Sequence, residues 1–156
     1  MMRTAIAIAL VLCSMLRASI TARADDLGAV NSIKVLVIGL RSNVGEVDCA
    51  LFGGAVGFPS DSSKAGKTTK SKIENEQAVC IFADVAPGDY AVSVFHDENS
   101  NGKLDRNFMG MPKEGVGASN DAAGHFGPPK YDDARFNYKG GRSVLAIHVK
   151  YLVAPL

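Results

Sequence analysis

The sequence has no tryptophan, three cysteines and no apolar run long enough to cross a membrane as a helix. A transmembrane helix needs roughly 20 apolar residues, whereas the run from Ala5 to Leu16 is interrupted by Cys13 and Ser14. Without tryptophan, a domain of this size offers little cleft and no stacking surface for a sugar, which argues against glycoside hydrolysis. The chain also has no G-x-S-x-G element, so a serine hydrolase of that type is not expected.

The N-terminus has the pattern of a secretory signal. Arg3 precedes the apolar run, and Ala22-Arg23-Ala24 supplies small residues around a cleavage point. We expect residues 1–24 to be a signal peptide that is removed before Asp25. One domain, residues 25–156, then remains in the periplasm or outside the cell, with no transmembrane anchor. A membrane anchor and a lipoprotein signal are the alternatives, and both match the residue pattern less well.

Positive charge is scarce in this expected mature domain. Removal of the signal peptide would remove three arginines and no acidic residue. The mature domain would then have 14 of the 17 basic residues and all 16 acidic residues. Proteins that bind nucleic acid neutralise phosphates with a surplus of Lys and Arg. We therefore expect no nucleic-acid partner, and the partner is instead an unidentified protein or small molecule.

Two cysteines remain after processing, Cys49 and Cys80. An even pair in an exported chain predicts a disulfide, and two buried thiols are the alternative. Apolar residues alternate around each cysteine, which places both on the inward faces of strands. Closing a loop of this length stabilises a fold by about 3–4 kcal/mol in the chain-entropy model.

Apolar residues alternate along most of the chain, and the β-branched runs end at Gly, Pro, Asn or Asp, which indicates strands. The sequence predicts an all-β fold, namely a single antiparallel β-sandwich, Ig-like or prealbumin-like, with a long ordered loop before the last strand. Turn residues at 84–89 predict a hairpin between the third and fourth strands. The expected strands are Ser32–Leu40, Glu46–Phe52, Gln77–Val85, Asp89–His96 and Ser143–Val153.

Two long stretches lack this alternation. Residues 54–75 are rich in Gly, Ser and Lys, and we expect a mobile surface loop there. Its Gly66-Lys67-Thr68 is not a P-loop, because Asp61 stands where the first glycine is required. The connection from Asp97 to Arg142 is too long for a structureless loop in a compact domain. We expect a short helical turn at Tyr131–Arg135 and a second ordering element within this connection.

The most specific pattern begins at the end of the fourth expected strand. Side chains with oxygen atoms alternate at 97, 99 and 101, a glycine follows at 102, and an acid stands at 105. This is the first part of an EF-hand-type loop, in which Ca²⁺ takes six to eight oxygen ligands, one of them a backbone carbonyl. The predicted metal ligands are Asp97, Asn99, Asn101, Lys103 and Asp105.

The loop is incomplete at its twelfth position, where Phe108 replaces the expected bidentate acid. Glu98, Glu114, Asp132 or Asp133 is expected to complete the shell from elsewhere. The alternative is a series of Asx turns without metal, because the same residue types favour chain reversal. Carboxylates crowded into so few residues repel one another unless a cation or Arg106 compensates their charge, so we expect the loop to be better ordered with Ca²⁺ as its cofactor.

The three histidines, His96, His125 and His148, lack the paired spacing of a transition-metal site. We expect His148 to pack within the last strand and His96 to form a hydrogen bond beside the loop. A small hydrolase that uses His96, Asp97 and Glu98 is the least favoured hypothesis, and it rests on the frequency of catalytic groups on loops at strand ends.

Four stretches of the chain carry a family resemblance: Cys49–Phe52, Cys80–Asp105, Met109–Asn120 and Pro128–Phe136. Together they resemble the bacterial family catalogued as domain of unknown function 2141. The resemblance implies export, and the family pattern includes the Asp/Asn loop. The strand pattern from Phe82 to Val94 is also similar to prealbumin-type and carboxypeptidase-regulatory-type sandwich modules, which bind or support rather than catalyse.

These observations lead to one functional expectation and one alternative. We expect an exported, non-enzymatic binding module in which a Ca²⁺-ordered loop holds the 97–142 connection and presents Met109–Asn120 as a recognition surface. The alternative is a metal-free structural or envelope-associated interaction protein with the same fold.

Overall fold

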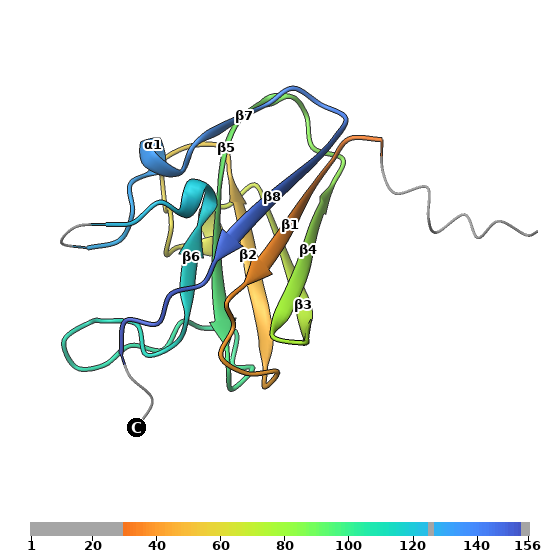
Figure 1. The fold of residues 1–156 in the computed structure, drawn as a ribbon. Coiled ribbons are helices and arrows are strands. Elements are labelled where there is room, and N and C mark those ends of the chain that lie inside the picture. The colour runs from red at the N-terminus through yellow and green to blue at the C-terminus, as the bar shows by residue number, and fades with distance from the viewer. Residues whose placement is uncertain (1–29, 125–126, 154–156) are drawn as a thin grey trace, which may run out of the picture.

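A computed structural model describes residues 30–124 and 127–153 of the chain (Figure 1). The expected signal peptide, residues 1–24, and His125 lie outside these described residues. Within the described ranges, no helix combines the length and the apolar character that a membrane crossing requires.

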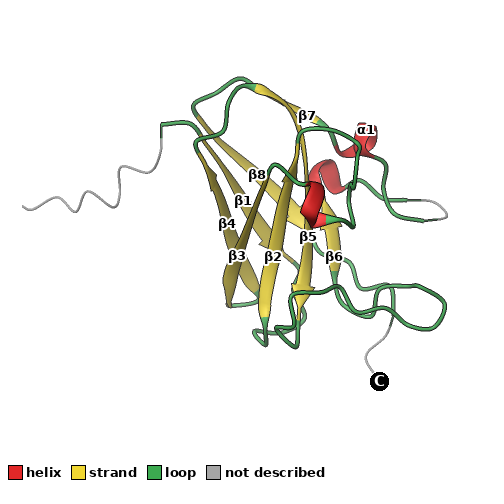
Figure 2. Cartoon of the chain, turned by 180° about the vertical axis from the view of Figure 1, so that it is seen from behind, coloured by secondary structure: helices red, strands yellow, loops and turns green. Residues whose placement is uncertain are grey.

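The described residues form strands connected by loops and by three very short helical segments (Figure 2). The strands are β1 Ser32–Ile38, β2 Glu46–Phe52, β3 Lys67–Glu74, β4 Gln77–Ala83, β5 Gly88–Asp97, β6 Val116–Ala118, β7 Phe136–Tyr138 and β8 Arg142–His148. The helical segments are the 3-10 turns η2 Ser62–Lys64 and η3 Ser119–Asp121 and the single α-helical turn α1 Tyr131–Ala134.

The strands make one mixed sheet in the order β6-β5-β2-β3-β4-β1-β8, and β7 pairs with the start of β5. All of these pairs are antiparallel except β1 and β8, which run parallel with Val35 opposite Leu145. After β8, Lys150 forms a bridge with Val116 of β6. The first and last strands of the order are thereby brought together, and the sheet is barrel-like and nearly closed.

The all-β prediction is confirmed, but the arrangement differs from a single antiparallel sandwich. Residues 54–75 were expected to form a loop, whereas most of their second half is the strand β3. This strand pairs with β2 along most of its length and with β4 at its end, so it joins the two halves of the sheet. Its side chains are mostly lysine, threonine and serine, with Ile73 as its one buried residue, which is why apolar alternation did not reveal it.

The predicted hairpin between the third and fourth strands is wrong. β4 pairs with β1 and β3, whereas β5 pairs with β2, β6 and β7. The turn residues do change the chain direction, with Asp84 at φ 53°. Val85 then buries its side chain in the core and donates its backbone N–H to the carbonyl of Asn31. The chain therefore crosses the end of the barrel instead of returning beside β4.

The interior of the barrel is apolar and contains the disulfide. The inward residues of β2 and β4 are buried, as their alternation predicted. Cys49 and Cys80 are bonded with an S–S distance of 2.00 Å. The bond links β2 to β4, which are separated by β3 in the sheet. The fully buried core side chains include Ile33, Val35, Val37, Val47, Leu51, Phe52, Phe82, Val92 and Ile147.

The connection from Asp97 to Arg142 contains more secondary structure than the single long loop that the sequence suggested. It includes β6, η3, α1 and β7. The helical turn begins at Tyr131, as predicted, and ends one residue earlier than expected. β6 covers the free edge of β5, with Val94 opposite Gly117. This strand divides the connection into a segment before it, which carries the Asp/Asn loop, and a segment after it.

Candidate functional site

Asp97 lies at the base of the Asp/Asn loop and is fully buried. One of its carboxylate oxygens, Oδ1, accepts the backbone N–H of Asn101 at 3.1 Å, and Oδ2 accepts the backbone N–H of Gly102 at 2.7 Å. Gly102 has φ 73°, the left-handed conformation that glycine adopts at little cost. Asp97 therefore folds the loop back over itself, as the first residue of a calcium-type loop does.

Two further predicted ligands, Asn99 and Asn101, contact a third, Asp105. The side-chain amide of Asn99 donates to Asp105 Oδ2 at 2.8 Å, and that of Asn101 donates to Asp105 Oδ1 at 3.4 Å. The amide oxygens of Asn99 and Asn101 each accept a backbone N–H two residues later, from Asn101 and Lys103. The structure thus brings Asp97, Asn99, Asn101 and Asp105 together, while Lys103 joins them through its backbone N–H.

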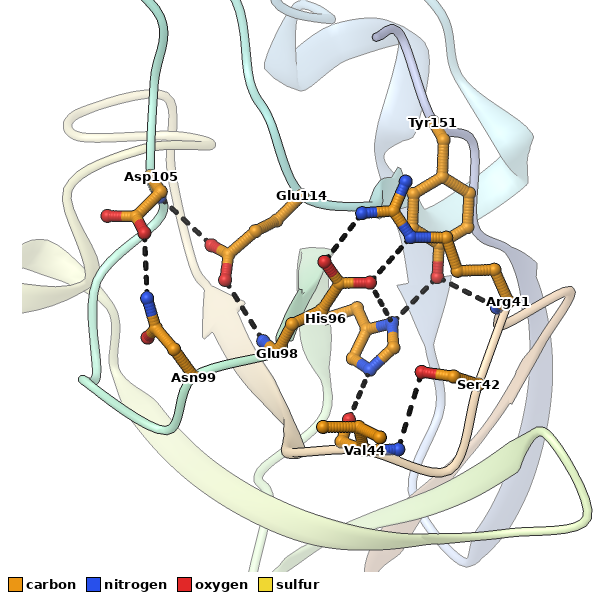
Figure 3. Close-up of polar contacts among 9 residues, drawn as sticks. All are labelled: Arg41, Ser42, Val44, His96, Glu98, Asn99, Asp105, Glu114 and Tyr151. Atoms are coloured by element: carbon orange, nitrogen blue, oxygen red, sulfur yellow. Dashed lines mark hydrogen bonds and ion pairs between the residues drawn. The ribbon is translucent and has the colours of Figure 1, made fainter. Parts of the chain in front are cut away.

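Glu114 closes the loop from outside the predicted ligand set (Figure 3). Its side chain is 4% exposed, and its two oxygens accept the backbone N–H groups of Glu98 at 3.0 Å and Asp105 at 2.9 Å. Of the four acids considered for the twelfth position, Glu114 is therefore the one that contacts both ends of the loop. Asp132 and Asp133 lie on α1, and Phe108 is 97% exposed.

His96 and Glu98 point away from the loop into a separate network at the end of the barrel (Figure 3). His96 is fully buried, with Nε2 2.7 Å from the carbonyl oxygen of Val44 and Nδ1 2.7 Å from the hydroxyl of Tyr151. Because a carbonyl only accepts, Nε2 carries a hydrogen and donates it to Val44. The backbone N–H of Arg41 donates to Tyr151, which completes the chain of bonds.

Glu98 is held by Arg41 through two hydrogen bonds of 2.6 Å, one from Nε and one from Nη2. These bonds hold the pKa of the Glu98 carboxyl below its usual value. The Arg41 guanidinium also stacks over the Tyr151 ring at 4.5 Å, and burial raises the pKa of this phenol. Both ring nitrogens of His96 have partners, whereas the Asp97 carboxylate lies in the Asp/Asn loop. The structure therefore does not bring Asp97 together with His96 and Glu98, the other two residues of the hydrolase hypothesis.

An acidic cluster lies beside the loop on the outer face of the sheet. Ligand atoms of Glu46, Asp48 and Asp97 lie within 4.8 Å of one another. The ammonium group of Lys70 lies 2.5 Å from Glu46 and 3.4 Å from Asp48, and supplies positive charge there. Among the residues that the structure describes, Asp48 Oδ2 is buried and has no hydrogen-bond partner, and burial raises the pKa of this carboxyl. Sequence reasoning missed this group because the pairing of β2 with β5, which places Glu46 opposite Asp97, was not expected.

The chain after the Asp/Asn loop forms a projecting hairpin at residues 105–113, here called the arm. Lys113 N–H donates to the carbonyl of Asp105, and Asn107 N–H donates to the carbonyl of Met111. The side chain of Asn107 accepts the backbone N–H groups of Met109 and Met111. At the tip of the arm, Phe108 is 97% and Met109 is 68% exposed. The arm overlaps the predicted recognition surface, Met109–Asn120, in its second half.

A cleft of about 590 Å³ lies beside the arm. Its lining residues come mainly from β5 and β6, from the arm, and from residues 121–124, 127–129 and the chain at 148–152. Figure 1 shows the arm and the segments 121–124 and 127–129 on the same side of the barrel, with β6 between them. His148 also lines this cleft. It was expected to pack within the sheet, but its side chain is 57% exposed and lies 2.8 Å from Asp121.

Comparison with protein families gives one match. The family described as "Uncharacterized protein conserved in bacteria", DUF2141, matches residues 35–145, which include the strands β2 to β7, the disulfide, the Asp/Asn loop and the arm. The chain has no significant match among curated proteins or among solved structures. Because the match spans well over half of the chain, this protein belongs to the DUF2141 family of uncharacterized bacterial proteins.

Proposed function

We propose that the protein is an exported, non-enzymatic binding module in which a Ca²⁺-bound Asp/Asn loop fixes the base of the arm. The observation that carries this proposal is the closure of the loop by Glu114, which contacts the backbone at Glu98 and at Asp105. Asp105 is also the first residue of the arm. Any ion that tightens the loop would therefore also fix the direction in which the arm projects.

The donor set supports Ca²⁺ as the ion. The side chains of Asp97, Asn99, Asn101 and Asp105 each carry oxygen atoms. Asp97, Asp105 and the adjacent Glu114 are carboxylates, which is the chemistry that Ca²⁺ selects. Asp105 receives only neutral amide N–H groups from Asn99 and Asn101. A divalent cation would compensate the negative charge more completely than these amides do.

A specific observation favours the metal-free alternative as well. Both oxygens of Asp97 and of Glu114 already accept backbone N–H groups, and the loop closes through Asx turns. Lys70 supplies positive charge to the adjacent acidic cluster. In that alternative, the loop is a rigid turn and the protein is a structural or envelope-associated interaction partner.

Two further properties belong to this proposal. The Cys49–Cys80 bond supports a periplasmic or secreted location, because disulfides persist in oxidising compartments. The strands on either side of β3 supply the two faces of one apolar core, which supports kinship with prealbumin-type modules. In modules of that type the sheet acts as a scaffold, and the loops carry the binding surface.

Calorimetric titration with Ca²⁺ after chelator treatment tests the proposed ion. We expect saturable binding by the wild type and binding at least about tenfold weaker by Asp105→Asn, because removing a ligand charge lowers Ca²⁺ affinity. Asp132→Asn is the matched control, since Asp132 is an exposed acid on α1, and it should bind as the wild type does. Absence of binding at millimolar Ca²⁺ would remove the ion and leave the metal-free alternative.

A further inference from the structure

The cleft beside the arm has the composition of a binding site for an apolar chain. Its floor is the outer face of β5 and β6, where Phe95 and Val116 lie. Met109 and Met111 of the arm form one wall, and Leu152 belongs to the same lining. Methionine side chains adapt to the shape of a ligand because they are unbranched and polarizable. Mostly apolar clefts of this volume with few polar groups are typical of small-molecule sites.

The charges of the cleft are mainly positive. Arg106 and Lys150 line it, and neither forms an ion pair within 4.0 Å among the residues that the structure describes. Arg106 uses its guanidinium for the carbonyl of Gly110 and the hydroxyl of Ser60, both of which are neutral. The acid of the cleft, Asp121, is bound by the backbone N–H and the ring of His148, and these hydrogen bonds, with a smaller effect from the charge of Lys150, lower the pKa of its carboxyl.

We propose that this cleft binds an amphiphile with a single apolar chain and an anionic head group, and that Arg106 and Lys150 bind the head group. The apolar lining accounts for the chain, and Arg106 and Lys150, neither of which has a close ion pair among the described residues, account for the charge. The arrangement disfavours a cationic amphiphile, whose head group would lie against Arg106 and Lys150. This inference rests on the proposed function of a binding module, and it adds the chemical class of the ligand.

Titration of the full mature chain with three ten-carbon probes tests the inference. Decanoate, decanol and decyltrimethylammonium share a chain and differ in head-group charge. Chemical shifts of the cleft amides report binding, with decanoate kept below the solubility of its calcium salt. We expect decanoate to bind about tenfold tighter than decanol, because a hydrogen bond to a charged group adds this much discrimination. Decyltrimethylammonium should bind more weakly than decanol.

Variants locate the head group. Arg106→Gln and Lys150→Gln should each weaken decanoate by several-fold and leave decanol unchanged, whereas Arg106→Lys should keep most of the affinity. Lys139→Gln is the matched control, because Lys139 lies in the turn between β7 and β8 and does not line the cleft. A loss of binding in Arg106→Gln counts only when its amide spectrum remains that of the folded protein, and Lys150→Gln gives an independent reading.

Vesicles distinguish a free amphiphile from a membrane lipid as the source of this chemistry. Binding of monomeric decanoate identifies a free amphiphile. Binding only to phosphatidylglycerol vesicles and not to phosphatidylcholine vesicles, with loss in Arg106→Gln, identifies an anionic lipid. Equal affinity for decanoate and decanol, or no binding to any probe or vesicle, overturns the inference. The Ca²⁺ titration is a separate measurement, so failure of the ligand and failure of the proposed ion are distinguishable.

Discussion

Replacement of Glu114 by glutamine tests the closure of the Asp/Asn loop. Glu114 is 4% exposed and accepts two backbone N–H groups, one at each end of the loop. Glutamine keeps one acceptor oxygen and presents an NH2 group to the other N–H, which leaves a buried donor without a partner. A buried donor without a partner lowers the free energy of unfolding by about 1–3 kcal/mol, and the hydrogen bond that remains is weaker because its acceptor is neutral instead of charged. We therefore expect Glu114→Gln to lower the free energy of unfolding by about 2–3 kcal/mol.

Urea unfolding followed by circular dichroism measures this change, since the chain has no tryptophan for fluorescence. Chelator in the buffer separates loop closure from any effect of Ca²⁺. Glu74→Gln, at an exposed position of β3, is the control and should stay within about 0.5 kcal/mol of the wild type. If Glu114→Gln also stays within about 0.5 kcal/mol, Glu114 does not hold the loop and the reasoning fails.

Three further predictions concern other parts of the fold. Arg41 holds the pKa of the Glu98 carboxyl below its usual value of 4.5. Ionised Glu98 therefore stabilises the folded protein above pH 4.5, and this stabilisation is lost as the pH falls toward the pKa of Glu98 in the folded state. Glu98→Gln should therefore lower stability at pH 7 more than at pH 3.5 in urea unfolding, and an equal loss at both would contradict this sign. Burial raises the pKa of Asp48 above 3.8, so the ionised carboxylate costs stability at neutral pH. Asp48→Asn should raise the free energy of unfolding at pH 7 by about 1 kcal/mol, the lower end of the cost of a buried unsatisfied group, and a loss would mean that the contact with Lys70 outweighs burial. Replacing Cys49 and Cys80 together by alanine should cost about 3–4 kcal/mol for a separation of 31 residues, and a thermal melt close to that of the wild type would contradict the role of the bond.

The buried strands were predictable because their inward residues are apolar. Glu46–Phe52 was predicted to the residue, and both cysteines were placed inward from the alternation around them. β3 was not predictable in this way, since Thr69 and Ser71 face the same side as its buried Ile73. β6 and β7 have three residues each, which is too short for a periodic pattern. Both strands pair with β5, and their own three residues give no indication of this pairing.

The candidate site was predictable only in its local part. Asp97, Asn99, Asn101 and Asp105 lie within nine residues, and their turn chemistry follows from residue type and spacing. Glu114 was one of four acids that the sequence could not rank. The contacts of His96 with Tyr151 and of Glu98 with Arg41 span 55 and 57 residues, so only the fold brings these partners together. The cleft likewise depends on the closeness of β6 to the chain after β8.

The most direct test of the account is the effect of Ca²⁺ on the backbone amides of residues 97–117, measured by NMR on isotope-labelled protein after chelator treatment. If the ion orders the loop and thereby the base of the arm, the shifts should be largest at Asn101, Gly102 and Asp105, and hydrogen exchange should slow through Glu114. Amides of β1 and β8 should stay unchanged. A spectrum that does not respond to millimolar Ca²⁺, or responds only at exposed acids outside the loop such as Asp132, would contradict the account.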